Sequence, residues 1–216
     1  MSKYQYDYPH PAVTTDIVIF SLRQKELSIQ LIKRKEEPFK GSWALPGGFV
    51  HMDESLEECA RRELIEETGF EPSYLEQLQA FSDPVRDPRE RVITVAFFSL
   101  LPSEGTKLEA GTDASDARWF PLDKLPNLAF DHREIVDLAG ERMQERVKTS
   151  TLAFGLLTEE FTLSEVQNVF EQVTGENLDR RNFRKWLLKT FSVVDTGTVQ
   201  GGVSNRPAAI FRLGSD

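Results

Sequence analysis

The sequence predicts an α/β domain followed by a smaller domain of two helices and two strands. The first observation is a set of apolar segments, bounded by Gly, Pro and charged residues, that have the length of β-strands. The second is an amphipathic helix that follows a Pro-Gly-Gly turn and stands between such segments. The third is a change of pattern near residues 145–152, where a long helix ends and a new apolar segment begins. We therefore expect one domain over residues 1–149 and another over residues 150–216.

Composition restricts the kind of protein. The chain has 216 residues, of which 39% are hydrophobic and 28% charged, a balance that suits globular domains and not a disordered chain. No apolar run approaches the roughly 20 residues that a membrane helix needs, and the start lacks the apolar core of a signal peptide. Cys59 is the single cysteine, so no intrachain disulfide can form. We expect a cytoplasmic protein without a membrane partner.

Charge is distributed unevenly along the chain. The net charge of −9 argues against a protein that coats nucleic acid non-specifically. Residues 150–216 carry 7 basic and 8 acidic side chains, so the excess of acid belongs to residues 1–149. In the nearly neutral second domain, only locally clustered basic residues could attract a polyanion.

Apolar periodicity indicates the strands of the first domain. Five segments qualify, over residues 13–22, 27–33, 75–81, 91–101 and 118–120. A later helix should begin at Asp131, with Glu134 in capping-box position and an apolar stripe that extends to Val147. His132, at that start, is expected to be a polar neighbour of the cap rather than a catalyst.

The helix after the Pro-Gly-Gly turn is the best-defined element of the chain. Ser55 and Glu58 form a capping box, so the helix should begin at Leu56, and Gly69 is the expected stop. Apolar residues at helical spacing, Cys59 among them, fall on one side. The helix can therefore bury one apolar stripe.

Three carboxylates converge on another face of this helix. Glu63, Glu66 and Glu67 stand at positions i, i+3 and i+4. Like charges at this spacing repel each other by a few tenths of a kcal/mol per pair, so the arrangement calls for a cation or for open solvent. Hard ions such as Mg²⁺ bind carboxylate oxygens, polarise a pyrophosphate and lower the pKa of an attacking water. The alternative is a solvated acidic helix face.

The spacing of this stretch resembles the Nudix box at every fixed position. The matching residues are Gly48, Glu54, Arg62, Glu63, Leu64, Glu66, Glu67, Gly69 and Phe70. The resemblance implies a Nudix α/β/α sandwich and metal-dependent hydrolysis of a nucleoside diphosphate linked to another group. It implies metal ligation by the three glutamates and by the carbonyl of Gly47, with Mg²⁺ as the expected ion and Mn²⁺ as the alternative. Glu54, Arg62 and Glu66 belong to the expected catalytic set, in which Glu54 and Arg62 brace the loop and the helix by an ion pair.

Two further groups of candidates lie outside the box. Nudix enzymes often draw a base or another ligand from a distant loop, and the candidates for that role are Glu109, Asp113 and Asp116. A rigid segment at residues 82–91 is rich in arginine, which suits phosphate and stacks on bases. Its candidates for substrate binding are Arg86, Arg89 and Arg91. The alternative for this segment is a solvated connector.

The second domain has the element order of a winged helix-turn-helix. A helix over residues 162–174 and a second over residues 179–190 precede two strands over residues 193–199 and 208–213. The basic residues are Arg180, Arg181, Arg184, Lys185 and Lys189 on the second helix and Arg206 between the strands. A basic second helix suits the major groove of double-stranded DNA, and an arginine in the wing suits phosphate or the minor groove. The alternative is a packing domain whose open face is merely solubilised.

The two halves together resemble the Nudix-related transcriptional regulators of NAD metabolism, and this resemblance covers essentially the whole chain. It is carried by the segments 154–157, 161–163, 178–184 and 206–208 beside the box. The resemblance implies a homodimeric repressor of NAD metabolism genes that binds ADP-ribose or a related nucleotide and then releases operator DNA. Members of this family often have a degraded box, whereas this box is intact. We therefore also expect Mg²⁺-dependent hydrolysis of ADP-ribose to AMP and ribose 5-phosphate.

Two other functions fit the same residues. The protein could be a ligand-gated repressor of a sugar or cofactor pathway that does not hydrolyse its ligand. It could also be a Nudix hydrolase whose C-terminal module only dimerises. Turnover of ADP-ribose and binding of operator DNA are the properties that separate these alternatives from the main prediction.

Overall fold

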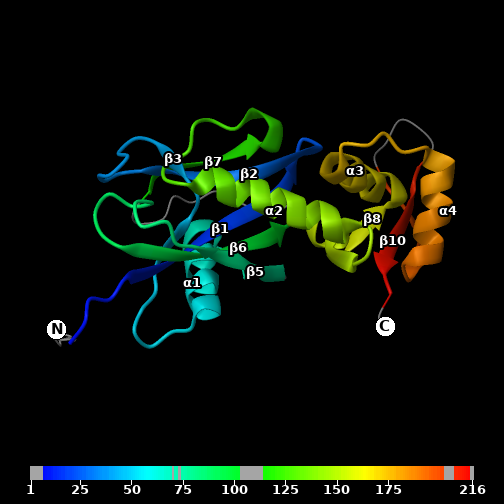
Figure 1. Ribbon diagram of the computed structural model, residues 1–216. Coiled ribbons are helices and arrows are strands. Elements are labelled where there is room, and N and C mark those ends of the chain that lie inside the picture. Colours follow the sequence, from blue (N-terminus) through cyan, green and yellow to red (C-terminus); the bar gives the residue numbers. More distant parts are fainter. Residues whose placement is uncertain (1–6, 70, 73, 103–113, 202–206, 215–216) are drawn as a thin grey trace.

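The body of the first domain is a twisted mixed β-sheet (Figure 1). The computed structural model describes residues 7–69, 71–72, 74–102, 114–201 and 207–214. Neighbouring strands follow the order β3–β2–β1–β6–β5, with β4 beside β1 and β7 beside β2. Their bounds are β1 Ala12–Arg23, β2 Glu26–Arg34, β3 Trp43–Ala44, β4 Gly47–Phe49, β5 Tyr74–Phe81, β6 Val92–Leu101 and β7 Ala114–Pro121. The central strand β1 runs parallel to β6 and antiparallel to β2 and β4.

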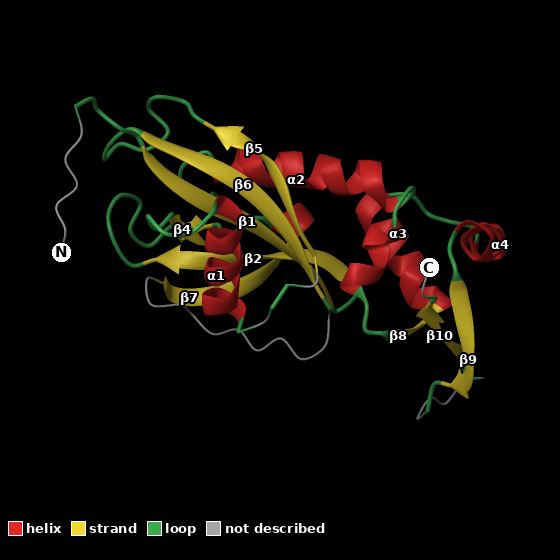
Figure 2. Ribbon diagram, turned by 90° about the horizontal axis from the view of Figure 1, so that it is seen from below, coloured by secondary structure: helices red, strands yellow, loops and turns green. Residues whose placement is uncertain are grey.

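Helices cover both faces of this sheet (Figure 2), because the central strand is apolar on both sides. On one face, α1, Leu56–Thr68, shares an apolar cluster with Ile17. On the other face, α2, His132–Val147, shares a cluster with Val18. Side chains of successive strand residues point to opposite faces, so this split follows from the pleat. The predicted α/β/α sandwich is confirmed.

α1 begins and ends where its sequence predicts. Ser55 Oγ accepts a hydrogen bond from the Glu58 amide at 3.3 Å, and the Glu58 carboxylate accepts one from the Ser55 amide at 2.7 Å. Gly69 follows in the left-handed conformation with φ 72°, and its amide donates to the carbonyl of Ile65. The predicted capping box and stop are confirmed.

α2 begins at the predicted place but without the predicted capping box. Asp131 is its N-cap residue, yet the Asp131 side chain makes no capping hydrogen bond. Its two carboxylate oxygens instead accept hydrogen bonds from Arg86, at 2.6 and 2.8 Å. The expectation of a capping box between Asp131 and Glu134 is wrong, because a residue distant in sequence competes for the carboxylate.

β7 is longer than the predicted strand over residues 118–120. It pairs with β2 from Pro121 back to Ala114, so it takes in the end of the segment expected to be a loop. The short 3₁₀ helix η1, Leu122–Lys124, follows it. Glu109 and Asp113 lie outside the described residues, and Asp116 lies in β7.

The second domain has the predicted helix–turn–helix–hairpin order with one added strand. The bounds are η2 Thr151–Leu156, β8 Glu160–Thr162, α3 Leu163–Thr174, α4 Arg180–Thr190, β9 Val193–Val199 and β10 Ala209–Leu213. β8 was not expected; it pairs with the outer side of β10 to give the order β8–β10–β9. The apolar side of α4 packs inward, with Phe183 and Leu187 buried and Trp186 packed edge-on against Phe170. This is a winged helix domain, as predicted.

One apolar core joins the two domains. A single cluster of buried residues contains Phe98 of the sheet, Met143 of α2 and Phe170 of α3. Polar contacts cross the junction beside it: the Leu27 amide donates to Gln172 Oε1, and Asn168 Nδ2 donates to the carbonyl of Lys25, both at 3.1 Å. The domains therefore meet through a packed interior, and a boundary after residue 149 stays a prediction. Within the described residues, no helix is long and apolar enough to cross a membrane.

Candidate functional site

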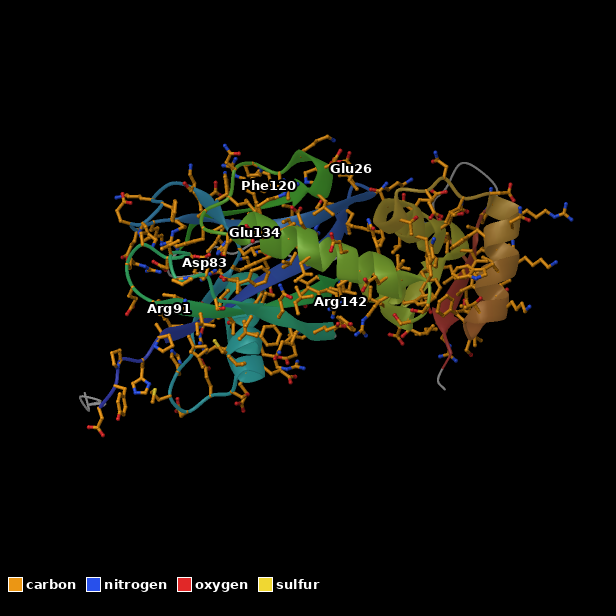
Figure 3. The ribbon with its side chains drawn as sticks, in the orientation of Figure 1. Glu26, Asp83, Arg91, Phe120, Glu134 and Arg142 are labelled. Atoms are coloured by element: carbon orange, nitrogen blue, oxygen red, sulfur yellow. The ribbon has the colours of Figure 1, made fainter. Side chains whose placement is uncertain are left out.

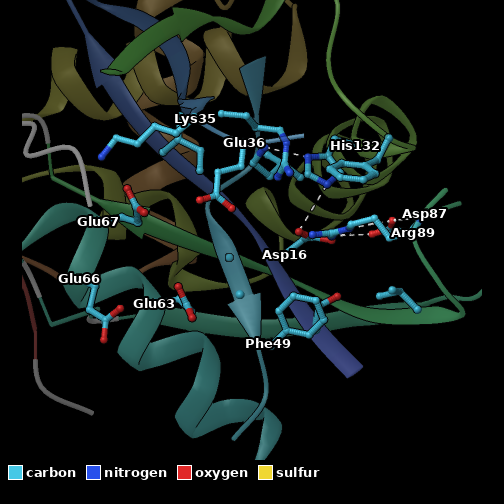
Figure 4. Close-up of a pocket in the computed structure, with 18 of the residues that line it drawn as sticks. Asp16, Lys35, Glu36, Phe49, Glu63, Glu66, Glu67, Asp87, Arg89 and His132 are labelled. Atoms are coloured by element: carbon cyan, nitrogen blue, oxygen red, sulfur yellow. Dashed lines mark hydrogen bonds and ion pairs between the residues drawn. The ribbon is translucent and has the colours of Figure 1, made fainter. Parts of the chain in front are cut away.

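A cavity of about 490 Å³ opens where β4 and α1 meet the 82–91 loop and the start of α2. Figure 4 shows Glu63, Glu66 and Glu67 of α1 on one side of it, with Asp16 and His132 on the other. The predicted site residues in its lining are Gly47, Arg62, Glu63, Glu66, Glu67, Arg86 and Arg89. The box and the arginine-rich loop, which are apart in the sequence, thus contribute to one cavity.

Two glycines bring the backbone of β4 close to the acidic helix. A Cβ on Gly48 would overlap the carboxylate of Glu63. Gly47 has φ 153°, in the region that favours glycine, and a Cβ there would overlap the carbonyl oxygen of Thr15. The Pro-Gly-Gly turn is therefore required by packing, because only glycine lets the Glu63 carboxylate lie against the strand.

The ion pair expected between Glu54 and Arg62 is present and bidentate. Arg62 Nη2 and Nε donate to the two Glu54 carboxylate oxygens at 2.7 and 3.0 Å, and Arg62 Nη1 donates to Glu63 at 2.7 Å. The His51 amide adds a hydrogen bond to Glu54 at 2.8 Å. Arg62 lowers the pKa of Glu54 to about 2, and Glu54 raises the pKa of Arg62 in turn. This pair fixes the loop against α1; its catalytic role stays a prediction.

This ion pair predicts a pH-dependent stability. The pKa of Glu54 is lowered from 4.5 to about 2 in the folded chain, so its contribution is full above about pH 4.5 and is lost as the pH falls through 2. We expect Glu54→Gln to destabilise the protein at neutral pH, and its deficit relative to wild type to shrink between pH 4.5 and 2. Urea unfolding at several pH values measures that deficit. Glu71→Gln, which removes an exposed partner of Arg61, should cost little throughout, and a pH-independent deficit for Glu54→Gln would contradict the prediction.

The three box glutamates differ in burial. Glu67 is buried, the Glu63 side chain is 13% exposed, and the Glu66 side chain is 54% exposed. Burial raises the pKa of Glu63, although Arg62 opposes the shift. A buried carboxylate of this kind, beside two others in one cavity, has the oxygen-donor chemistry that a hard divalent cation prefers. Within the described residues, no three His, Cys, Asp or Glu side chains already enclose a single metal position.

The arginines of the 82–91 loop occupy three different environments. The Arg86 side chain is only 4% exposed and pairs with Asp131 and, at 3.3 Å, with Asp16. Arg89 pairs with Asp87 at 2.7 Å and its guanidinium lies 5.7 Å from the centre of the Phe49 ring. Arg91 Nη1 donates to the carbonyl of Asp83 (Figure 3) and is absent from the described lining of the cavity. Arg86 and Arg89 thus line the cavity and Arg91 does not, and substrate binding by any of the three stays a prediction.

Three functional candidates were missed by the sequence: Asp16, Asp131 and His132. His132 is buried, its Nδ1 accepts a hydrogen bond from the Leu45 amide at 2.8 Å, and its Nε2 lies 3.5 Å from Asp16. Burial lowers the pKa of His132, so the ring is neutral with its proton on Nε2, toward Asp16. His132 thus links β1 and the turn between β3 and β4 to the start of α2, and is more than a neighbour of the cap. The available signal was Asp16, a charged residue inside the apolar run over residues 13–22.

The distant acidic candidates do not join the cavity in the described structure. Asp116 pairs with Arg118 at 2.6 Å on β7 and is not among the residues that line the cavity in the described chain. Glu109 and Asp113 lie outside the described residues. A base outside the box therefore stays a prediction.

A basic surface lies on α4, at the end of the molecule farthest from the N-terminus (Figure 1). All five predicted side chains of α4 are exposed: Arg180, Arg181, Arg184, Lys185 and Lys189. Asp179 caps the helix by accepting a hydrogen bond from the Asn182 amide at 2.9 Å. Because the apolar stripe of α4 is packed inward, its basic face is directed to solvent. Arg206 lies outside the described residues.

Both halves of the chain match described protein families. The NUDIX domain matches residues 10–139, and the NrtR DNA-binding winged helix domain matches residues 153–213. The ADPR responsive transcriptional repressor NtrR of Acinetobacter baylyi is 36% identical over 99% of this chain and 86% of its own length. The ADP-ribose pyrophosphatase of Methanocaldococcus jannaschii is 48% identical over 63% of this chain and 76% of its own length.

Solved structures of NrtR from Shewanella oneidensis show the same architecture. Its complex with a 27mer DNA is 34% identical and has a TM-score of 0.83, covering 94% of this chain and 93% of that one. Its NUDIX domain complexed with ADP ribose is 35% identical and has a TM-score of 0.57, covering 64% of this chain and 94% of that one. The similarity thus extends across both domains and their arrangement.

Proposed function

Because this chain belongs to the NUDIX family, in the branch that carries an NrtR DNA-binding winged helix domain, we propose that it is an ADP-ribose-responsive transcriptional repressor. It binds ADP-ribose in the cavity beside α1, hydrolyses it there, and binds operator DNA of NAD metabolism genes through α4. One observation carries the proposal: three box carboxylates and two arginines of the 82–91 loop share a cavity in the same chain that presents a basic helix. The names of two relatives support ADP-ribose as the ligand.

The hydrolytic half of the proposal assigns a role to each wall of the cavity. NUDIX hydrolases use a divalent ion, and we take Mg²⁺ as the ion, with Mn²⁺ as the alternative. Glu63, Glu66, Glu67 and the Gly47 carbonyl would hold it. When bound, it supplies a Lewis acid for the diphosphate and an activated water. Arg62 holds the Glu63 carboxylate against β4. The fixed position of this carboxylate would determine where the ion, and therefore the diphosphate, can lie.

The opposite wall of the cavity orients the substrate. Arg86 and Arg89 supply donors for the diphosphate. Phe49, whose side chain is 44% exposed at the cavity, supplies an apolar surface for a ring. Addition of water across the P–O–P link then gives AMP and ribose 5-phosphate.

The DNA-binding half requires two copies of the chain. A homodimer places two α4 helices on a palindromic operator, about 34–36 Å apart, which is one turn of DNA. Ligand regulates only if it binds the DNA-free conformation more tightly, since equal affinity for both shifts nothing. By linkage, operator DNA then weakens ADP-ribose binding by the same factor. We place the protein in the cytoplasm, where operator and nucleotide are both present.

The proposal is tested by one turnover assay and one pair of titrations. Protein incubated with ADP-ribose and Mg²⁺ should release AMP, and EDTA should stop the release. ADP-ribose affinity is then measured in Ca²⁺, to limit turnover, with and without a duplex selected by the protein from a random pool. Release of AMP with identical affinities would mean that ADP-ribose is a substrate and not the effector, and failure to select any duplex would leave a hydrolase whose C-terminal domain only dimerises. Different affinities without AMP would leave a sensor that does not turn over its ligand.

A further inference from the structure

The start of α2 is tied to the cavity wall by one carboxylate. Asp131 precedes the helix and accepts two hydrogen bonds from Arg86, whose guanidinium lines the cavity. Arg86 Nη2 also donates to Asp16 at 3.3 Å, whereas its Nη1 has no acceptor within the described chain. One side of the guanidinium is therefore held by carboxylates and another is left for a ligand.

The other end of α2 packs against the second domain. The helix has 16 residues and spans about 24 Å. Its last turns pack on η2 and α3, and Met143 and Val147 belong to the core shared with Phe170 (Figures 1 and 2). Just beyond it, Lys148 pairs with Glu176 at 2.9 Å. Packed side chains thus connect α2 with the DNA-binding domain.

The Asp131 side chain could accept a hydrogen bond from an amide of the first turn of α2, but it does not. An aspartate at an N-cap normally accepts a hydrogen bond from an amide of the first turn, and it also interacts favourably with the helix dipole. Here it has φ −92° and ψ 18° and its side chain caps nothing. Phe130, immediately before it, has φ 52°, a left-handed conformation that is strained for a residue with a side chain. Pairing with Arg86 thus keeps the helix start in a conformation that the local sequence disfavours.

The charge of this cluster also disfavours an anionic ligand. Asp16 and Asp131 share the single guanidinium of Arg86, and His132 beside them is neutral, so the cluster has a formal charge of −1. A diphosphate that approaches Arg86 therefore meets two carboxylates there, although Arg34, Arg62 and Arg89 also line the cavity and attract an anion. Phosphate competes well for guanidinium, because it also binds bidentately.

We infer that Asp131 is a positioning residue that exchanges partners when the cavity is filled. Without ligand it holds Arg86; with a diphosphate on Arg86 it turns to cap α2, and the shifted helix changes the position of the winged helix domain. This inference rests on the proposed function and names how the ligand is sensed. The coupling would thus pass from Arg86 in the cavity to Asp131 at the start of α2, and through α2 to the winged helix domain.

The test compares two substitutions of aspartate on the same helix. Asp131→Ser keeps a capping side chain but cannot pair with Arg86. Asp137→Ser removes an exposed carboxylate that pairs with Arg133 at 2.9 Å. For each protein, calorimetry measures ADP-ribose affinity in Ca²⁺ with and without the selected duplex. In wild type and in Asp137→Ser, the ratio of the ADP-ribose affinity without duplex to the affinity with duplex should be about 5–150. In Asp131→Ser the ratio should fall to within about 2-fold of one, and its DNA affinity without ligand should already be that of liganded wild type.

The outcomes separate this inference from the proposed function. Equal ADP-ribose affinities with and without the duplex in wild type would overturn the proposed function itself. A wild-type ratio that persists in folded Asp131→Ser would overturn the partner exchange and leave the proposed function standing. An independent measurement uses wild type alone: hydrogen exchange at residues 133 and 134 should slow when ADP-ribose saturates the protein. Unchanged exchange there would also overturn the inference, even if Asp131→Ser does not fold.

Discussion

Glu66→Gln should slow the hydrolysis of ADP-ribose by about 100-fold or more while the protein stays folded. The Glu66 side chain is half exposed and makes one long ion pair, 3.6 Å from Arg62, so the substitution should cost at most about 0.5 kcal/mol of stability. Catalytic metal binding is worth several kcal/mol, and each 1.36 kcal/mol is tenfold in rate. Steady-state release of AMP at saturating Mg²⁺ measures the effect.

A matched control lies on the same helix. Glu57→Gln makes the same chemical change at a side chain that is 63% exposed and pairs with Arg61 rather than with box residues. This variant should keep full activity, and both variants should melt near the wild-type temperature. If Glu66→Gln kept more than a tenth of the activity, the acidic face of α1 would be a solvated surface and not a metal site.

Replacing Arg181 and Arg184 together by alanine should weaken operator binding by about 100-fold while hydrolysis continues. Both side chains lie on the exposed face of α4, and the helix is held by Phe183 and Leu187, which remain. A bidentate contact from arginine to a base is worth about 1–3 kcal/mol, and 1.4 kcal/mol is tenfold in affinity. Fluorescence anisotropy of the selected duplex at two salt concentrations measures the loss and its salt dependence.

The control for this pair removes the same charge elsewhere. Lys124→Ala with Arg133→Ala takes two exposed cations from the first domain, neither of them on α4. Its affinity for the duplex should change by less than about threefold. Equal losses in the two double variants would mean that overall charge, and not α4, governs DNA binding.

Local signals in the sequence predicted most of the elements. Ser55 with Glu58, and Gly69 after them, gave the limits of α1, because caps depend on residues a few positions apart. β8 was missed, since three residues carry too little periodicity and its pairing with β10 is non-local. The capping box at Asp131 was predicted wrongly because Arg86, 45 positions away, takes the carboxylate.

The site residues also divide into those that local spacing predicts and those that only folding brings together. Glu63, Glu66 and Glu67 were predicted from helical spacing on one element. Asp16 and His132 come from a strand and a helix that meet only after folding, so no spacing identifies them. The roles predicted for Arg86 and Arg89 remain predictions, but the sequence could not indicate that Arg86 is buried between two carboxylates.

The shared core that contains Phe98 and Phe170 joins the two domains without a flexible linker. Across a flexible linker, the winged helix would range freely and ligand could alter only how often it meets DNA. Across a packed interior, the permitted motion is shear, in which helices slide by about 1–2 Å as side chains exchange neighbours. The regulatory displacement should therefore be small at the junction. In a dimer, a slight tilt at each junction would change the separation of the two α4 helices. Because the groove repeat of DNA is fixed, a changed separation would weaken simultaneous binding of both helices.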